Sequence, residues 1–195
     1  MKIIGLTGGI GMGKSTIAAA FRRARVPVFD ADAAVHALQG RGGAAVRAIG
    51  QAFPGAVRDG AVDRAALRAI AVPDPDAMRT LERILHPMVR AAEQAFLARA
   101  RRAGRSVVVL DIPLLLETGG ERRVDLVLVA SAPRSVQRAR VRARRRMTDA
   151  QIDAIIARQM PDAEKRRRAD VIISTGLSRY HALQPLRRLM QELQS

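Results

Sequence analysis

The sequence contains no cysteine and no tryptophan, and aromatic residues make up only 3% of its 195 residues. Without cysteine the chain can form no disulfide, no thiolate zinc site and no cysteine nucleophile. No apolar run approaches the roughly 18 residues that a membrane-spanning helix needs. These absences exclude disulfide scaffolds, zinc ribbons and thiol enzymes, and we expect no membrane partner.

Acidic residues are also few. Aspartate and glutamate number 18 against 34 lysines and arginines, which gives a formal net charge of +16. Lysine occurs only at positions 2, 14 and 165, so the excess comes almost wholly from arginine. Such a charge favours a polyanionic partner, either nucleic acid or a heavily phosphorylated small molecule. The few aromatic residues do not alternate with the arginine clusters as a base-stacking surface requires, so nucleic acid is not the expected partner.

The beginning of the chain contains a complete phosphate-binding loop. Gly8, Gly13, Lys14 and Ser15 fit G-x-x-x-x-G-K-[ST] without a mismatch. The apolar residues 2–7 before it predict a strand, and the alanine-rich run after it predicts a helix. The dinucleotide pattern G-x-G-x-x-G does not fit, because its third glycine would fall on Lys14. Strand, loop and helix in this order predict a nucleoside triphosphate site.

Each residue type in the loop has a chemical reason. Glycine at positions 9, 11 and 13 lets successive N–H groups turn inward around an anion, at the positive end of the helix dipole. Lys14 would reach the terminal phosphates, and the hydroxyl of Ser15 would bind Mg²⁺ directly. The loop follows the first methionine closely and leaves no room for a signal peptide, so we expect a cytoplasmic protein.

Further apolar runs predict four more strands, at residues 26–30, 107–111, 124–130 and 171–174. Their alternation with helices predicts a parallel sheet covered on both faces. Asp30, Asp32 and Asp111 lie at or just beyond strand ends, where ligands bind in open α/β sheets. Asp111 is a candidate to hold Mg²⁺ through water, and a hydrogen bond that braces the loop is the alternative.

Residues 33–103 show only helical patterns and no strand signal. We expect a helix boundary at His86-Pro87, because the residue before a proline avoids the helical region. Asp63 is expected to cap a helix that follows it. This part of the chain is interpreted as an insertion that forms a substrate-binding lobe.

The densest basic cluster follows the fourth predicted strand. Its arginines lie within one predicted helix: Arg134, Arg138, Arg140, Arg142, Arg144, Arg145 and Arg146. Arginines four residues apart on a helix repel one another, so we expect something anionic to offset the repulsion. Thr148 is expected to cap a second helix, and residues 165–168 add further positive charge. We interpret this hairpin as a lid that closes on phosphates, with a solvated arginine face as the alternative.

Several motifs together resemble the dephospho-coenzyme A kinases. Besides the phosphate loop, they are Asp30-Ala-Asp32, His86-Pro87, Asp-Ile-Pro-Leu-Leu-Leu-Glu at 111–117, Gln137 with Arg140 and Arg144, and Gln159 through Lys165 to Asp170. They occur in family order over nearly the whole chain. The resemblance implies an α/β fold of the P-loop NTPase and nucleoside monophosphate kinase type, with a five-stranded parallel sheet flanked by helices. The implied single domain has its core at 1–32, 104–135 and 169–195, a helical coenzyme A lobe at 33–103 and a basic lid at 136–168.

The resemblance also implies the reaction, which is phosphorylation of the ribose 3′-hydroxyl of dephospho-coenzyme A. ATP and Mg²⁺ are the implied cofactors, and the products are coenzyme A and ADP at the last step of coenzyme A synthesis. Another P-loop kinase of nucleosides or nucleotides and a nucleic-acid-binding P-loop NTPase are the alternatives. We expect a monomer or a weak homo-oligomer.

Site residues follow from the match between this sequence and the family motifs. The catalytic candidates are Lys14, Asp32 as the base, Arg140 and Thr7. The candidate ATP contacts are Gly9, Gly11, Met12, Gly13, Lys14, Ser15, Thr16 and Arg144. The candidate substrate contacts are Asp32, His86, Asp111, Leu115 and Glu117.

Three of these residues have simpler alternatives. Asp32 could cap a helix, Thr7 could bond neighbouring backbone and Glu117 could form a surface salt bridge.

Met12 replaces the usual serine of the family loop, where we expect the main-chain N–H to bind phosphate. Family members often have an asparagine after the last strand, where this chain has Ser174-Thr175-Gly176, so we make no prediction about contacts between that loop and adenine.

Overall fold

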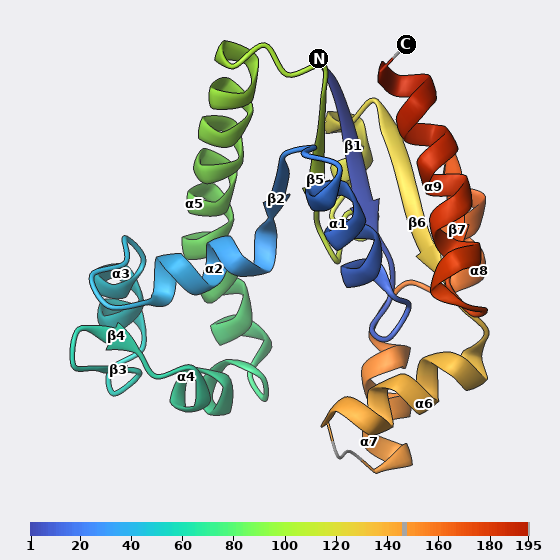
Figure 1. Cartoon of the computed structure of the whole chain (residues 1–195). Helices are drawn as coiled ribbons and strands as arrows, with labels where there is room; N and C mark the ends of the chain where they lie inside the picture. Colours follow the sequence, from blue (N-terminus) through green and yellow to red (C-terminus); the bar gives the residue numbers. More distant parts are fainter. Residues whose placement is uncertain (146–147, 195) are drawn as a thin grey trace. The chain divides into compact units, whose positions relative to one another are not determined.

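The computed structural model describes residues 1–145 and 148–194. The chain divides into two compact units, one made of Met1–Phe29 with Arg99–Ser195 and the other of Asp30–Ala98. The first contains the sheet and the phosphate loop, and the second is the mainly helical insertion (Figure 1). Within the described residues, no helix is both long enough and apolar enough to cross a bilayer.

The five predicted strands form one sheet. Its order is β2 (Val28–Asp30), β5 (Val107–Asp111), β1 (Lys2–Thr7), β6 (Leu126–Ser131) and β7 (Val171–Ser174). β1 pairs in parallel with both β5 and β6, and β6 pairs in parallel with β7. The five-stranded parallel sheet expected from the sequence is thus confirmed.

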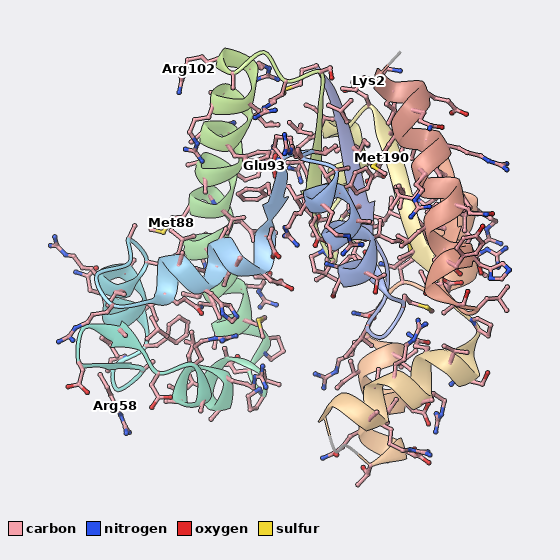
Figure 2. The ribbon with its side chains drawn as sticks, viewed as in Figure 1. Lys2, Arg58, Met88, Glu93, Arg102 and Met190 are labelled. Atoms are coloured by element: carbon pink, nitrogen blue, oxygen red, sulfur yellow. The ribbon has the colours of Figure 1, made fainter. Side chains whose placement is uncertain are left out.

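Successive side chains of β6 point to opposite faces of the sheet, and both faces are buried. Leu128 and Ala130 pack in the cluster that includes residues of α1 (Lys14–Arg23) and α9 (Arg179–Gln194). Met190 lies on the side of α9 that packs against this cluster (Figure 2). Val127 and Val129 point to the other face, where they pack with Leu115, Leu116 and Met160 near α8 (Asp162–Arg167). A strand buried on both faces needs an apolar run, which explains the sequence of β6.

The carboxyl edge of the sheet is polar. Thr7, Asp111, Ser131 and Ser174 are the last residues of β1, β5, β6 and β7. The short η1 (Gly120–Arg123) precedes β6, while α6 (Arg134–Arg145) and α7 (Asp149–Ala157) lie beyond this edge (Figure 1). Because parallel strands all end at one edge, the topology gathers these polar side chains around the phosphate loop.

The sequence led us to expect an insertion that is helical throughout, and this expectation is wrong. Its elements are α2 (Ala31–Gln39), α3 (Val46–Ala52), the antiparallel pair β3 (Val57–Arg58) and β4 (Ala61–Val62), α4 (Arg64–Ala71) and α5 (Pro75–Arg102). Asp59 and Gly60 connect β3 to β4 with φ of 51° and 74°. Two successive positive φ angles are typical of the tight hairpin turn that Asp-Gly favours, so the local signal was present in the sequence.

The expected helix boundary at His86-Pro87 is also wrong. α5 runs through Pro87 without a break. Proline inside a helix removes one hydrogen bond and crowds the preceding turn. Leu85 is buried in the core of the insertion, with Ile84 and Met88 packed against it (Met88 is labelled in Figure 2). Apolar packing on both sides of Pro87 therefore outweighs the local preference.

A buried ion pair joins α8 to the loop after β5. Lys165 Nζ lies 2.7 Å from Glu117 Oε1, and the side chains are only 1% and 18% exposed. The same carboxylate oxygen accepts the main-chain N–H of Met160 at 3.2 Å, and Lys165 Nζ lies 3.5 Å from Pro113 O. The basic cluster at 165–168 therefore contains one buried cation with a structural partner.

We expect Glu117→Gln to destabilise the protein by about 3 kcal/mol, because it leaves the Lys165 ammonium buried without its counter-ion. Lys165→Met should cost a similar amount, because it leaves the Glu117 carboxylate, whose Oε2 is buried, without its counter-ion. The double variant should be more stable than the sum of the single effects predicts, and urea unfolding of all four proteins measures this coupling. The exposed pair Asp76 and Arg79 is the control and should show coupling near zero. Additive losses at 117 and 165 would contradict the assignment.

Candidate active site

The phosphate loop takes a shape that favours glycine at three of its positions. Gly8, Gly11 and Gly13 have φ of 153°, 74° and 87°. A β-carbon at Gly13 would lie 2.7 Å from Thr175 Oγ1. α1 begins at Lys14 with no side-chain cap at Gly13 and no acidic residue in its first turn. The first N–H groups of a helix have no partner four residues back, and the Thr16 N–H donates to Gly13 O at 3.0 Å, so the amides of Lys14 and Ser15 are left to bind an anion.

Lys14 stands at the junction of loop and helix and forms an ion pair with Asp111. Its Nζ lies 2.5 Å from Asp111 Oδ1, and the side chains are 17% and 5% exposed. The pairing of β1 with β5 aligns Leu6 with Asp111, which places the aspartate beside the loop. The structure thus holds an ammonium group and a carboxylate together at the end of the central strands.

Arg140 and Thr175 brace the loop from the other side. Thr175 is buried, and its hydroxyl donates to Met12 O at 2.6 Å. Arg140 donates to Thr175 Oγ1 at 3.0 Å, to Thr175 O at 2.5 Å and to Gly11 O at 3.3 Å. The guanidinium therefore links α6, the loop after β7 and the phosphate loop. The sequence did not predict this role for Thr175.

Carboxylates of α7 neutralise much of the basic α6. Arg134 and Arg138 pair with Asp153, and Arg142 pairs with Asp149. The hydrogen bond from Arg138 lowers the pKa of Asp153, and the one from Arg142 lowers the pKa of Asp149. Both carboxylates stay ionised at neutral pH. The expected anion thus includes side chains of the neighbouring helix, whose cap by Thr148 is confirmed as a full capping box with Gln151.

The remaining loop residues lie as follows. Ser15 is exposed at the start of α1 and Thr16 is partly exposed. The Met12 side chain is buried, and its N–H donates to Gly9 O at 3.1 Å. In this conformation the Met12 amide is therefore engaged within the loop.

Residues near the end of β1 and after β5 make mainly structural contacts. Thr7 donates to Pro113 O at 2.9 Å, which is the simpler alternative named for it. Leu115 is completely buried, and a β-carbon at Gly5 would lie 2.6 Å from it. The expected substrate contact cannot come from the Leu115 side chain as it stands, because core packing encloses it.

The other candidates lie in the insertion or outside the described side chains. Asp30 caps α2, since its carboxylate accepts the N–H of Ala33 at 3.0 Å. Asp32 is exposed in the first turn of α2. Within the described residues, its carboxylate forms no hydrogen bond or ion pair. His86 is exposed on α5. The Arg144 side chain lies outside the described residues.

The donor set suits a magnesium nucleotide. Mg²⁺ binds through one or two protein oxygens together with phosphates and waters. The Ser15 hydroxyl and the Asp111 carboxylate are oxygens of the required kind, and the glycine cradle with its helix N-terminus suits phosphates. In the segments that the structure describes, no three His, Cys, Asp or Glu side chains gather into a metal cluster.

Comparison with known proteins agrees with this geometry. A family model described as dephospho-CoA kinase matches residues 2–178. The chain is 64% identical over 166 residues to a dephospho-CoA kinase of Paramagnetospirillum magneticum, covering 85% of this chain and 78% of that protein. It is 54% identical over 193 residues to the enzyme of Rhodopseudomonas palustris strain HaA2, covering 99% of this chain and 94% of that protein.

Solved structures show the same fold. A crystal structure from Thermus thermophilus aligns with a TM-score of 0.86 at 36% identity, covering 98% of this chain and 97% of that one. A Campylobacter jejuni dephospho-CoA kinase aligns with a TM-score of 0.73 at 22% identity, covering 98% and 99% of the two chains, which supports the fold alone. The matched family model spans almost all of the sequence, and the chain belongs to the dephospho-CoA kinase family.

Proposed function

We propose that the chain transfers the terminal phosphoryl group of ATP to the ribose 3′-hydroxyl of dephospho-coenzyme A, and that coenzyme A and ADP are the products. The main support for this proposal is the Lys14–Asp111 ion pair, which lies beside an open glycine loop in a chain of this kinase family. Phosphoryl transfer requires positioning and charge neutralisation more than covalent catalysis. The site supplies both.

On the donor side, the amides at the start of α1 and the Lys14 ammonium would bind the phosphates. Lys14 would exchange Asp111 for a phosphate oxygen when the nucleotide enters. Ser15 would hold Mg²⁺ directly and Asp111 through water. The bound ion would supply positive charge near the transferred group.

On the acceptor side, Asp32 is our candidate for the general base. A ribose hydroxyl is a weak nucleophile at neutral pH, so a carboxylate that accepts its proton is expected. Asp30 already caps α2, which supports a different role for the exposed Asp32. His86 and Glu117 are further candidates for substrate contacts, and Glu117 would act through the loop that it holds with Lys165.

Arg140 is proposed to screen charge on the transferred group, with Arg144 as a second candidate. In the structure Arg140 bonds Gly11 O and so already touches the loop. The guanidinium has five N–H donors, which allows one group to brace Thr175 and still face a phosphate.

The acceptor assay tests the proposed function most directly. With ATP and Mg²⁺ present, ADP release measured by a coupled assay should require dephospho-coenzyme A and should be near background with adenosine or AMP. Mass spectrometry should find the added phosphate on the ribose. Equal turnover with AMP would favour a nucleotide kinase instead.

Two lysine variants control that assay. Lys14→Ala should abolish ADP release, because it removes the only side-chain cation of the phosphate loop. Lys2→Ala alters an exposed lysine at the start of β1 and should leave the rate unchanged.

We expect Asp32→Asn to lower kcat by about 100-fold or more while ATP affinity stays nearly constant, because the amide cannot accept the ribose proton. Steady-state kinetics together with ATP titration separates the two effects. Asp63→Asn is the control, since Asp63 caps α4 in the same unit and asparagine caps equally well. A kcat within a few-fold of wild type for Asp32→Asn would reduce this residue to a structural role.

A further inference from the structure

The main chain of Ile10, in the middle of the phosphate loop, is held on both sides by glutamine side chains. Its N–H donates to Gln159 Oε1 at 2.9 Å, and its carbonyl oxygen accepts from Gln137 Nε2 at 2.8 Å. Gln137 lies in α6, and Gln159 follows the end of α7. Both partners of one loop residue thus come from the basic hairpin, far along the chain.

The loop glycines are shaped to these two side chains. A β-carbon at Gly9 would lie 3.1 Å from Gln159 Oε1 and 3.4 Å from Gln137 Nε2. A β-carbon at Gly11 would lie 2.8 Å from the main-chain oxygen of Gln137. The absence of side chains at positions 9 and 11 therefore lets the loop approach the glutamines closely. The glycine pattern and the two amides form one packing arrangement.

Both glutamines are themselves fixed. Gln137 is only 4% exposed. Gln159 is followed by Met160, whose N–H donates to Glu117, and by Asp162, which accepts the Ser131 hydroxyl at 2.7 Å. The segment after α7 is thereby bonded to the loop after β5 and to the end of β6. Gln159 presents its amide from a support that does not depend on the phosphate loop.

The chemistry of the two positions requires neutral amides. Gln137 must donate to a carbonyl, and Gln159 must accept from an N–H. Glutamate at 137 could not donate when ionised, and glutamate at 159 would place a negative charge beside the phosphates. Glutamine satisfies both main-chain groups without repelling the nucleotide.

We propose that Gln137 and Gln159 are positioning residues that hold the two peptide groups flanking Ile10 and so keep the phosphate loop in its nucleotide-binding conformation. This inference rests on the proposed function for the identity of the donor. It adds that the basic hairpin contributes to ATP affinity through these neutral side chains as well as through its arginines.

The test measures ATP binding in the presence of Mg²⁺ by calorimetric titration without an acceptor, so it does not depend on the identity of the acceptor. Gln159→Ala and Gln137→Ala should each weaken ATP binding about tenfold, because each removes one hydrogen bond to the loop. The double variant should lose less than the product of the single effects, since both side chains hold the main chain of the same residue, Ile10. In turnover, the KM for ATP should rise while the KM for dephospho-coenzyme A stays constant.

The matched control is Gln151→Ala. Gln151 lies in the same hairpin but bonds the N–H of Thr148, so its loss should alter helix capping and leave ATP affinity unchanged. Gln159→Glu keeps an acceptor for Ile10 and adds a charge. Its ATP affinity should be lower than that of wild type at low ionic strength and should recover partly at high ionic strength.

Unchanged ATP affinity in Gln159→Ala would overturn the proposal. An equal loss of ATP affinity in Gln159→Ala and in the control Gln151→Ala would overturn it too. Because Gln159 is partly exposed, its variant should fold even if the buried Gln137→Ala does not. If wild type binds ATP but does not phosphorylate dephospho-coenzyme A, the proposed acceptor fails. The binding data then still decide the inference about the two glutamines.

Discussion

The ion pair between Lys14 and Asp111 is the interaction on which the rest of the site depends. It joins the start of α1 to the end of β5, beside the central strand β1, at the sheet edge where the phosphate loop leads into the helix. Both side chains are largely buried, so the Lys14 ammonium group has little access to solvent. An incoming phosphate would replace one anionic partner with another, and the charge on Lys14 would stay neutralised throughout.

The loop around this lysine has little freedom of its own. Thr175 and Arg140 hold it at Met12 and Gly11, and the two glutamines hold it at Ile10. These partners come from α6, from the segment after α7 and from the loop after β7. A phosphate cradle made of glycine pays a large conformational entropy cost when it becomes ordered. Contacts that order it before the nucleotide arrives lower the cost of binding.

Much of this architecture could be predicted from the sequence because its signals are local. The phosphate loop, the apolar strands and the caps at Asp63 and Thr148 each follow from a few neighbouring residues. The Asp59-Gly60 turn was also a local signal, but the helical patterns around it outweighed it in our interpretation. Pro87 shows the opposite case, where a local rule was applied and tertiary packing overrode it.

The contacts within the site could not be predicted in the same way. Lys165 belongs to a basic run, and nothing in that run indicates that only this side chain turns inward to Glu117. The pairing of Arg138 with Asp153 depends on how two helices meet. Gln137 and Gln159 stand out in the family motifs, but their common target, Ile10, becomes apparent only in three dimensions.

The most direct measurement is a crystal structure of the protein with Mg²⁺ and a non-hydrolysable ATP analogue. The account predicts that the β-phosphate lies within hydrogen-bond distance of the first amides of α1, and that Lys14 Nζ has moved from Asp111 to a phosphate oxygen. An analogue bound elsewhere, or a filled loop in which Lys14 still pairs with Asp111, would contradict it.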